Sequence, residues 1–298
     1  MVSSSMKYVH VDVFSPVPYS GNSLVVFPDA AGLTGTQMAL ITKELRHFEA
    51  IFLEMAGDPR AYRARVFDLM EELPFAGHPV IGAACTLHAL AGAAETAQWT
   101  IELKARTARV ETQRRAEGRF FARLDQGAAE FLGTWADRAP EIASWFSLAR
   151  KDLDDSLPPE TVSTGLRYLI VPVQREALAR ARISIPDLEV RLAAMGAQFA
   201  YLIDPAGMEG RHWNNDGIIE DVATGSAAGC VAAYLRRHDR IGDGRSVVLK
   251  QGRFVGRASE IAVTAHGSGT DIRSVEIGGD VSLVGTGRLD VLPDVRRS

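Results

Sequence analysis

Two segments of the chain, one in each half, join a glycine-bearing polar loop to an Ala-rich apolar run. The first reads ELPFAGHPVIGAACTLHALAG over residues 72–92, and the second reads IIEDVATGSAAGCVAAYLRRHDR over residues 218–240. A helix that is apolar on every side belongs in the interior of a domain. The chain must therefore surround two separate helices, which predicts two similar halves.

Local signals predict where these two helices begin and end. Proline suits the first position of a helix, so the first helix is expected to begin at Pro79 and to stop at Gly92. The second helix is expected to follow the loop that contains Thr224. It ends in Arg236, Arg237 and His238, whose charge favours a helix C-terminus.

The remaining segments read as a mixture of strands and helices, which indicates an α+β fold. Apolar residues at helical spacing predict helices over 34–48, 141–148 and 185–195. Strands are expected over residues 8–14, 24–27, 50–53, 62–67, 100–102, 108–112, 120–124, 130–135, 168–172, 199–203, 246–250, 260–264, 274–278 and 281–284. We predict two domains, 1–127 and 128–298, each a curved mixed sheet wrapped around a central helix.

Length and composition agree with a two-domain protein and exclude several classes of partner. At roughly 150 residues per domain, 298 residues suggest two domains. Hydrophobic residues make up 46% and charged residues 23%, as in ordinary globular proteins. The formal net charge of −4 leaves no basic excess for nucleic acid or an anionic membrane. The N-terminus does not read as a secretory signal, so we expect a cytoplasmic protein.

The loops that precede the two apolar helices are candidates for ligand binding. Helix N-termini expose unpaired N–H groups and carry partial positive charge, so two of them could hold a carboxylate or a phosphate. Neither loop matches a nucleotide-binding motif. Capping is the alternative, since Thr224 or Ser226 could simply satisfy its own helix.

Two residues of the first half are candidate acid/base groups. Glu49 stands among Phe48, Ala50 and Ile51, and such a setting would raise the pKa of a carboxylate toward the range of a general base. The alternative is a solvated glutamate at a strand end, which is the common place for this residue type. His78 directly precedes the expected helix and could act on a ligand, or it could be a structural histidine.

The second half adds one candidate acid, and the cysteines add little. Asp221 precedes the second apolar helix, where capping alone would explain a carboxylate. Cys85 and Cys230 lie inside the apolar helices and read as small buried hydrophobes. His88 could meet Cys85 on one helix face, but two ligands do not make a metal site, so no metal is expected.

Several segments resemble the PhzF family of phenazine-biosynthesis-like isomerases, relatives of diaminopimelate epimerase. They occur in the family's order along nearly the whole chain. These segments are VDVFSPVPYSGNS, ELRHFEAIF, ELPFAGHPVIGAA, VSTGLRYLIVPV, EDVATGSAAG and KQGRFVGRAS.

The resemblance implies a fold of two similar halves and a set of site residues. Glu49 would be the proton-transferring acid/base, and His78 and Asp221 would assist it by holding or tuning the substrate. Ser226 would also bind substrate, with Gly77 and Gly225 supplying backbone donors. The family uses no metal or organic cofactor and is commonly dimeric, so a homodimer acting on a small carboxylate is expected.

Departures from the family pattern leave the substrate open. Ser23, Val222 and Ala258 replace prolines of the family motifs, and Asp68 adds a carboxylate upstream of the GHP loop. The leading hypothesis is an isomerase of secondary metabolism that moves a proton between carbons. Two alternatives are a two-base epimerase or racemase and a binding protein of the same fold that has lost turnover.

Overall fold

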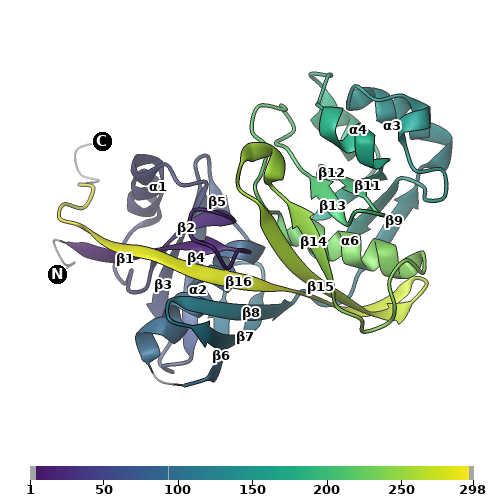
Figure 1. Cartoon of the computed structure of the whole chain (residues 1–298). Helices are drawn as coiled ribbons and strands as arrows, with labels where there is room; N and C mark the ends of the chain where they lie inside the picture. The colour runs from purple at the N-terminus through teal and green to yellow at the C-terminus, as the bar shows by residue number, and fades with distance from the viewer. Residues whose placement is uncertain (1–4, 93, 295–298) are drawn as a thin grey trace. The chain divides into compact units, whose positions relative to one another are not determined.

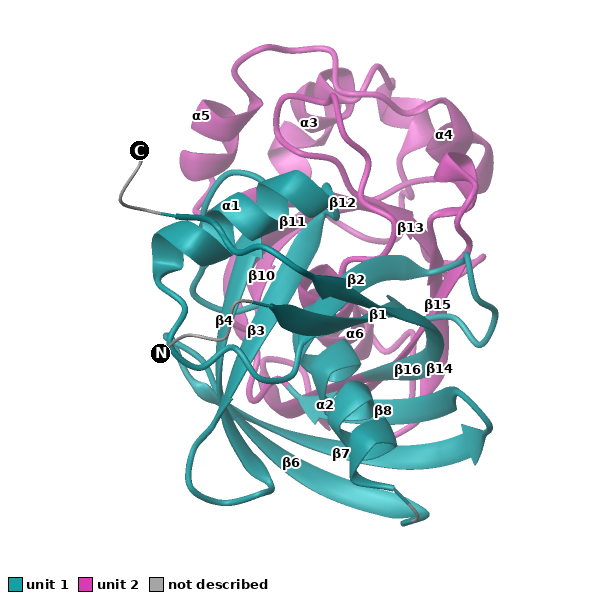
Figure 2. Cartoon of the chain, turned by 90° about the vertical axis from the view of Figure 1, so that its left-hand side faces the viewer, with its two compact units in different colours: residues 1–125, 278–298 teal, residues 126–277 magenta. Residues whose placement is uncertain are grey.

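A computed structural model describes residues 5–92 and 94–294, and the chain divides into two compact units (Figure 2). Unit 1 comprises Met1–Asp125 and Gly278–Ser298, and unit 2 comprises Gln126–Ile277. These units differ from the domains predicted from the sequence, because the C-terminal segment returns to unit 1 and pairs with its first strand.

Unit 1 is a sheet that closes on itself (Figure 1). Its strand order is β1-β2-β3-β4-β6-β7-β8-β16, and β16 also pairs with β1, while the short β5 pairs with β4. Its elements are β1 (Met6–Val13), β2 (Asn22–Phe27), α1 (Gly35–Leu45), β3 (Glu49–Met55), β4 (Ala61–Asp68), β5 (Glu72–Leu73), α2 (Gly77–Ala91), β6 (Thr96–Glu102), β7 (Thr107–Ala116), β8 (Arg119–Asp125) and the end of β16 (Asp271–Leu289).

The apolar helix α2 lies inside this closed sheet, as the sequence predicts. It contacts β1, β2, β3, β6, β7 and β8, and residues 77–88 are all buried. A Cβ at Gly82 would lie 2.5 Å from the Leu24 side chain, so only glycine allows α2 to approach β2 this closely.

The predicted start of α2 is wrong by two residues. The helix begins at Gly77, so Pro79 is its third residue and His78 lies within the first turn. Proline is tolerated there because the N–H groups of the first turn have no acceptor inside the helix. The predicted end is confirmed, since Gly92 is the C-cap with a φ of 96°.

Helix α1 covers a second apolar cluster of unit 1. Met38 and Ile41 pack against Val25, Phe27 and other residues of the cluster. Thr34 is the N-cap and forms a capping box with Gln37. The spacing of apolar residues predicted this helix because it has one buried face.

Unit 2 holds the second apolar helix, α6, which contacts β10, β11 and β15. Its strand order is β16-β15-β14-β13-β12-β11-β10-β9. Its elements are β9 (Glu130–Thr134), α3 (Ala139–Trp145), β10 (Glu160–Ser163), β11 (Arg167–Pro172), α4 (Arg175–Arg180), α5 (Leu188–Ala193), β12 (Phe199–Asp204), β13 (Glu209–Arg211), α6 (Gly225–Arg237), β14 (Val247–Gln251), β15 (Ser259–Ser268), the start of β16 and 3₁₀ turns at Ala136–Arg138, Arg150–Asp152 and Arg253–Val255.

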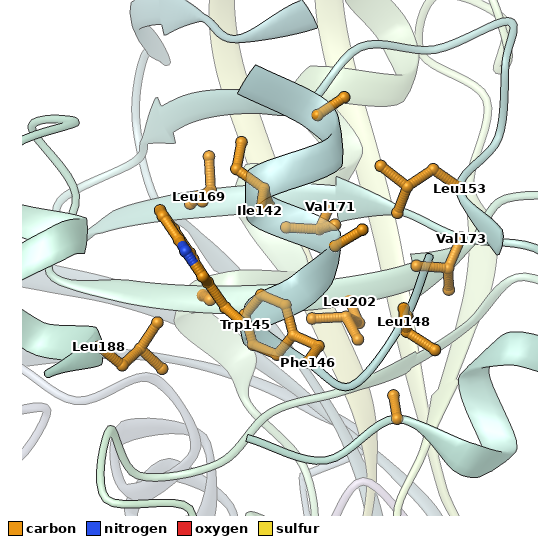
Figure 3. Packing of buried hydrophobic residues seen from close by; sticks show 14 of the residues in the cluster. Ile142, Trp145, Phe146, Leu148, Leu153, Leu169, Val171, Val173, Leu188 and Leu202 are labelled. Atoms are coloured by element: carbon orange, nitrogen blue, oxygen red, sulfur yellow. The ribbon is translucent and has the colours of Figure 1, made fainter. Parts of the chain in front are cut away.

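A large apolar cluster joins the small helices of unit 2 to its sheet (Figure 3). Ile142 and Trp145 of α3 are fully buried and pack with Val171 of β11 and Leu202 of β12. Helix α5 adds Leu188 to the same cluster. Each half is thus an α+β unit built around a central helix, which confirms the predicted fold class.

The last strand differs most from the sequence prediction. Two strands, 274–278 and 281–284, were expected with a Gly/Asp turn between them, but the structure has the single strand β16. A Cβ at Gly278 would lie 2.6 Å from the carbonyl oxygen of Ala122, so this glycine allows a close approach of β8 rather than a turn. Across residues 5–92 and 94–294, no helix is both long and apolar enough to cross a lipid bilayer.

Candidate active site

Glu49 is the first residue of β3 and lies on the side of the sheet that faces α2. It pairs with Leu24 of β2 and with Asp68 of β4. The Leu24 side chain contacts the backbone of α2 at Gly82, and paired residues of neighbouring strands point to the same face. Only 9% of the Glu49 surface is exposed, so the carboxylate is in a largely dry environment.

His78 lies beside this carboxylate. Its Nε2 atom is 3.8 Å from Oε2 of Glu49, and 6% of its side chain is exposed. The distance is longer than a hydrogen bond but short enough for the carboxylate to interact electrostatically with a protonated imidazole. Unit 1 therefore brings together the two candidate acid/base residues that were predicted from its sequence.

The N-terminus of α2 adds positive potential at His78. Ala76 is the N-cap and has no side chain that could accept a hydrogen bond, and Gly77 is the first helical residue. By contrast, Thr34 caps α1 with its hydroxyl group. The N-cap residue of α2 thus offers no side-chain acceptor to the first turn, and a helix N-terminus can bind an anionic ligand.

Asp68 faces its own turn instead. Its Oδ1 atom accepts hydrogen bonds from the backbone N–H groups of Met70, at 2.7 Å, and Glu71, at 2.6 Å. This carboxylate therefore stabilises the turn between β4 and β5.

Unit 2 gathers the second group of candidates at the start of α6. Thr224 donates a hydrogen bond of 2.6 Å from its hydroxyl to Oδ2 of Asp221. Ser226 Oγ lies 2.8 Å from the hydroxyl of Tyr168. Thr224 is the N-cap residue but makes no side-chain capping bond, and Ser226 is already the second residue of the helix. Simple capping therefore does not explain Thr224 or Ser226, while Gly225 is the first residue of α6.

Several polar residues around Asp221 could not be predicted from local sequence. Gln251 of β14 hydrogen-bonds Thr224 and Asp221 across 27 and 30 positions of the chain. Arg211 forms an ion pair with Glu220 at 2.6 Å, and the backbone N–H of Asp221 donates to the carbonyl of His212. Burial lowers the pKa of His212 although the Asp221 charge opposes this, so His212 is neutral near pH 7.

Both cysteines lie in surroundings that suppress reactivity. Burial raises the pKa of Cys85 far above its usual range, and the Asp280 carboxylate adds to the effect. Burial also raises the pKa of Cys230 to about 12. Such thiols are not nucleophiles at neutral pH, which disfavours a mechanism with two thiol bases. Among the described residues, no group of three or more His, Cys, Asp or Glu side chains could hold a metal ion.

Comparison of the sequence with known proteins shows to which family the chain belongs. Residues 11–287 match the PhzC-PhzF family, described as phenazine biosynthesis-like proteins. The trans-2,3-dihydro-3-hydroxyanthranilate isomerase of Pseudomonas aeruginosa is 31% identical, and the alignment covers 95% of this chain and 98% of that enzyme.

Solved structures agree with this assignment. A predicted epimerase from Pseudomonas aeruginosa is 48% identical with a TM-score of 0.89, covering 95% of this chain and 99% of that one. A PhzF family protein from Bacillus anthracis is 25% identical with a TM-score of 0.82, covering 96% and 99%. A probable proline racemase from Agrobacterium radiobacter, at 13% identity and a TM-score of 0.60 over 95% and 92%, shares the fold. The chain therefore belongs to the PhzC-PhzF family of phenazine biosynthesis-like proteins, and it is an isomerase.

Proposed function

We propose that this isomerase moves a proton between two carbons of a small cyclic, amino-acid-like carboxylate without a cofactor, in a pathway of secondary metabolism. The observation that carries the proposal is the buried pair of Glu49 and His78, 3.8 Å apart at the N-terminus of α2. A single carboxylate that takes a proton from one carbon and returns it to another needs no redox group.

Each candidate residue has a role that follows from its position. The Glu49 carboxylate removes the proton from carbon and becomes neutral when it is protonated. His78 lies close enough to interact electrostatically with the carboxylate while it is ionised. Backbone N–H groups at the α2 and α6 N-termini, including those of Gly77 and Gly225, would bind the negative charge of the substrate. Asp221 and Ser226 would bind its polar groups.

The compound in the name of three relatives provides the first substrate to test. Three relatives at 30–31% identity carry the name trans-2,3-dihydro-3-hydroxyanthranilate isomerase. We propose this compound as the reference substrate, together with a panel of small unsaturated and cyclic amino acids. The replaced motif residues Ser23, Val222 and Ala258 are the positions at which a different preference could arise.

The first prediction is that Glu49→Gln abolishes proton transfer. In deuterated water, the native enzyme should introduce deuterium at carbon in the product, and the variant should lose about 100-fold or more of this rate, as expected for removal of a general base. Proton NMR of the reaction mixture measures the label. Glu54→Gln is the matched control, since Glu54 lies on the same strand with 51% of its side chain exposed. Undiminished labelling by Glu49→Gln would remove Glu49 from this role.

The two-base epimerase remains the second candidate, because one of the similar structures carries the description predicted epimerase. Two bases that act on opposite faces of a carbon must be separated by the substrate itself. His78 lies too close to Glu49 to be that second base, so Asp221 would have to serve. Inversion at one carbon, with label only there, would favour the epimerase, whereas a moved double bond favours the isomerisation.

The remaining alternative is a binding protein of the same fold without turnover. Such a protein would show ligand-induced thermal stabilisation but no product from any compound of the panel. We expect a homodimer, which sedimentation velocity would distinguish from a monomer. A cytoplasmic location also stays a prediction, to be checked by cell fractionation.

A further inference from the structure

Gln251 is the centre of a buried polar network in unit 2. It is the last residue of β14, and 1% of its surface is exposed. Its side-chain amide takes part in four hydrogen bonds, to groups of Tyr201, Thr224 and Asp221. A fully satisfied buried amide of this kind has one orientation and holds its neighbours in place.

The partners determine which end of the amide is oxygen and which is nitrogen. The backbone N–H of Thr224 can only donate, so the atom 3.1 Å from it must be Oε1. The backbone carbonyl of Asp221 can only accept, so the atom 2.9 Å from it must be Nε2. These two constraints agree, and the Tyr201 hydroxyl completes the set by donating to Oε1 at 3.0 Å.

The same logic determines the direction of the Thr224 hydroxyl. Nε2 of Gln251 donates to Thr224 Oγ1 at 2.9 Å, so this oxygen is an acceptor on that side. Its own proton is therefore available to Oδ2 of Asp221, 2.6 Å away. This is a charge-assisted hydrogen bond, which is stronger than a bond between neutral groups.

Packing keeps the network in this state. Tyr201 reaches Gln251 across β13, where a Cβ at Gly210 would lie 2.2 Å from the Tyr201 ring. Burial raises the pKa of Tyr201 far above its usual range, and the Asp221 charge adds to this, so its hydroxyl remains a donor. A Cβ at Gly252 would lie 2.5 Å from the carbonyl oxygen of Val222, so β14 and the loop before α6 are in close contact.

We propose that Gln251 and Thr224 are positioning residues, which act through hydrogen bonds to hold the Asp221 carboxylate in the one orientation that serves the reaction. The inference rests on the proposed function, in which Asp221 binds substrate. It assigns a role to a hydroxyl that stands at the N-cap of α6 without capping the helix. It also explains why the Gln251 side chain is buried at the end of β14, 30 positions after Asp221 in the chain.

The main test compares Thr224→Val with Thr224→Ser, using deuterium incorporation into trans-2,3-dihydro-3-hydroxyanthranilate. Valine has the shape of threonine but no hydroxyl, so kcat/KM should fall by about 10- to 100-fold, the loss expected for one hydrogen bond to a charged group. Serine keeps the hydroxyl and should stay within about threefold of the native rate. Thr161→Val is the matched control, because Thr161 is buried in the same unit and donates its hydroxyl to Met195 instead.

A pH profile of Gln251→Glu separates positioning from a purely structural role. An ionised glutamate cannot donate to Thr224, so the hydroxyl would turn toward residue 251 and leave Asp221. A protonated glutamate has a donor again, so the ratio of variant to native rate should rise as the pH falls from about 8 to about 5. A ratio that does not change with pH would contradict the inference.

Crystal structures of the Thr224 variants make the inference testable even without turnover. The Asp221 carboxylate should change its orientation in Thr224→Val and keep it in Thr224→Ser. An unchanged carboxylate in Thr224→Val together with a native rate overturns the inference. Asp221→Asn distinguishes this from failure of the proposed function: a native rate in that variant would remove Asp221 from the proposed function and with it the role of its two partners. A reduced rate in Asp221→Asn together with a native rate in Thr224→Val would overturn the inference alone.

Discussion

Residues of the same type differ in exposure to solvent according to their position in the fold. Glu49 and Glu54 both lie on β3, yet Glu49 is buried beside His78 while half of the Glu54 side chain is exposed. Where water is excluded, a carboxylate loses its hydration shell and its electrostatic interactions become stronger. The apolar neighbours of Glu49 in the sequence were therefore the informative signal.

Our second prediction concerns the two thiols. Cys85 and Cys230 are fully buried, and their pKa values are raised, that of Cys230 to about 12. Because the thiolate is the reactive form, neither residue should react with iodoacetamide at about pH 8 in the native protein, and both should react in urea. Mass spectrometry counts the adducts.

A double Cys→Ala variant provides the complementary measurement for these thiols. It should retain deuterium incorporation, since the proposed proton carrier is a carboxylate. Rapid labelling of the native protein together with an inactive double variant would instead indicate thiol chemistry.

Local motifs could predict only part of the candidate site. Glu49, His78 and Asp221 stand next to glycine-bearing loops or at element ends, so their positions in the chain suggested a role. Gln251 also stands at a strand end before a glycine, within the segment KQGRFVGRAS, but nothing in the sequence indicated its partners, which lie about 30 positions earlier and are brought close by the packing of β14. Contacts of this kind depend on tertiary structure, which a single sequence does not reveal.

Among the elements, those with a clear apolar pattern were predicted, and some short ones were not. Helix α1 was expected because its apolar residues repeat on one face. Strand β10 and helix α4 were missed, since four and six residues are too few to show a period. The expected helix 185–195 is shorter in the structure, at Leu188–Ala193. Glycine misled the prediction of β16 because it allows close approach as well as turns.

Strands β1 and β2 and the segment after α1 are joined by a polar contact on the face of the sheet opposite α2. Ser23 Oγ lies 2.8 Å from Nε2 of His10 and 3.0 Å from Nδ1 of His47. The two imidazole rings are 4.7 Å apart in an edge-to-face arrangement. Ser23 occupies a position where the family usually has proline, which has no hydroxyl to make this contact.

The third prediction follows from this contact. Ser23→Ala should lower the free energy of unfolding by about 1 to 2 kcal/mol, because two histidine nitrogens lose a hydrogen-bond partner in a part-buried site. Urea unfolding followed by circular dichroism measures the loss. Ser23→Thr keeps the hydroxyl and should restore most of the stability. Equal stability of Ser23→Ala and the native protein would show that the contact contributes nothing.

On the scale of the whole molecule, the two units repeat one plan. Each surrounds an Ala-rich helix whose N-cap residue makes no side-chain capping bond, α2 in unit 1 and α6 in unit 2. Hydrophobicity on every side of these helices was enough to predict this plan from the sequence. The assignment of residues to units was not predictable, because the pairing of β16 with β1 joins the two ends of the chain.

The fourth prediction concerns the C-terminal segment. A chain that stops at Ile277 lacks the part of β16 that pairs with β1, so an edge of the unit 1 sheet would be exposed. Exposed sheet edges promote association, and we expect this truncated chain to aggregate and to lose the native near-ultraviolet circular dichroism spectrum. Adding residues 278–298 as a separate peptide should restore part of the signal. A monomeric truncated chain with a cooperative unfolding transition would contradict the prediction.

The return of the last strand also determines when each unit can fold on the ribosome. Unit 2 is one uninterrupted stretch of chain, whereas unit 1 needs both its first residues and those after 278. Its N-terminal part must therefore wait, incompletely paired, while the later unit is translated and completed. The unit that emerges first from the exit tunnel is the one that finishes folding last, and chaperones that bind nascent chains would find their substrate in residues 5–125.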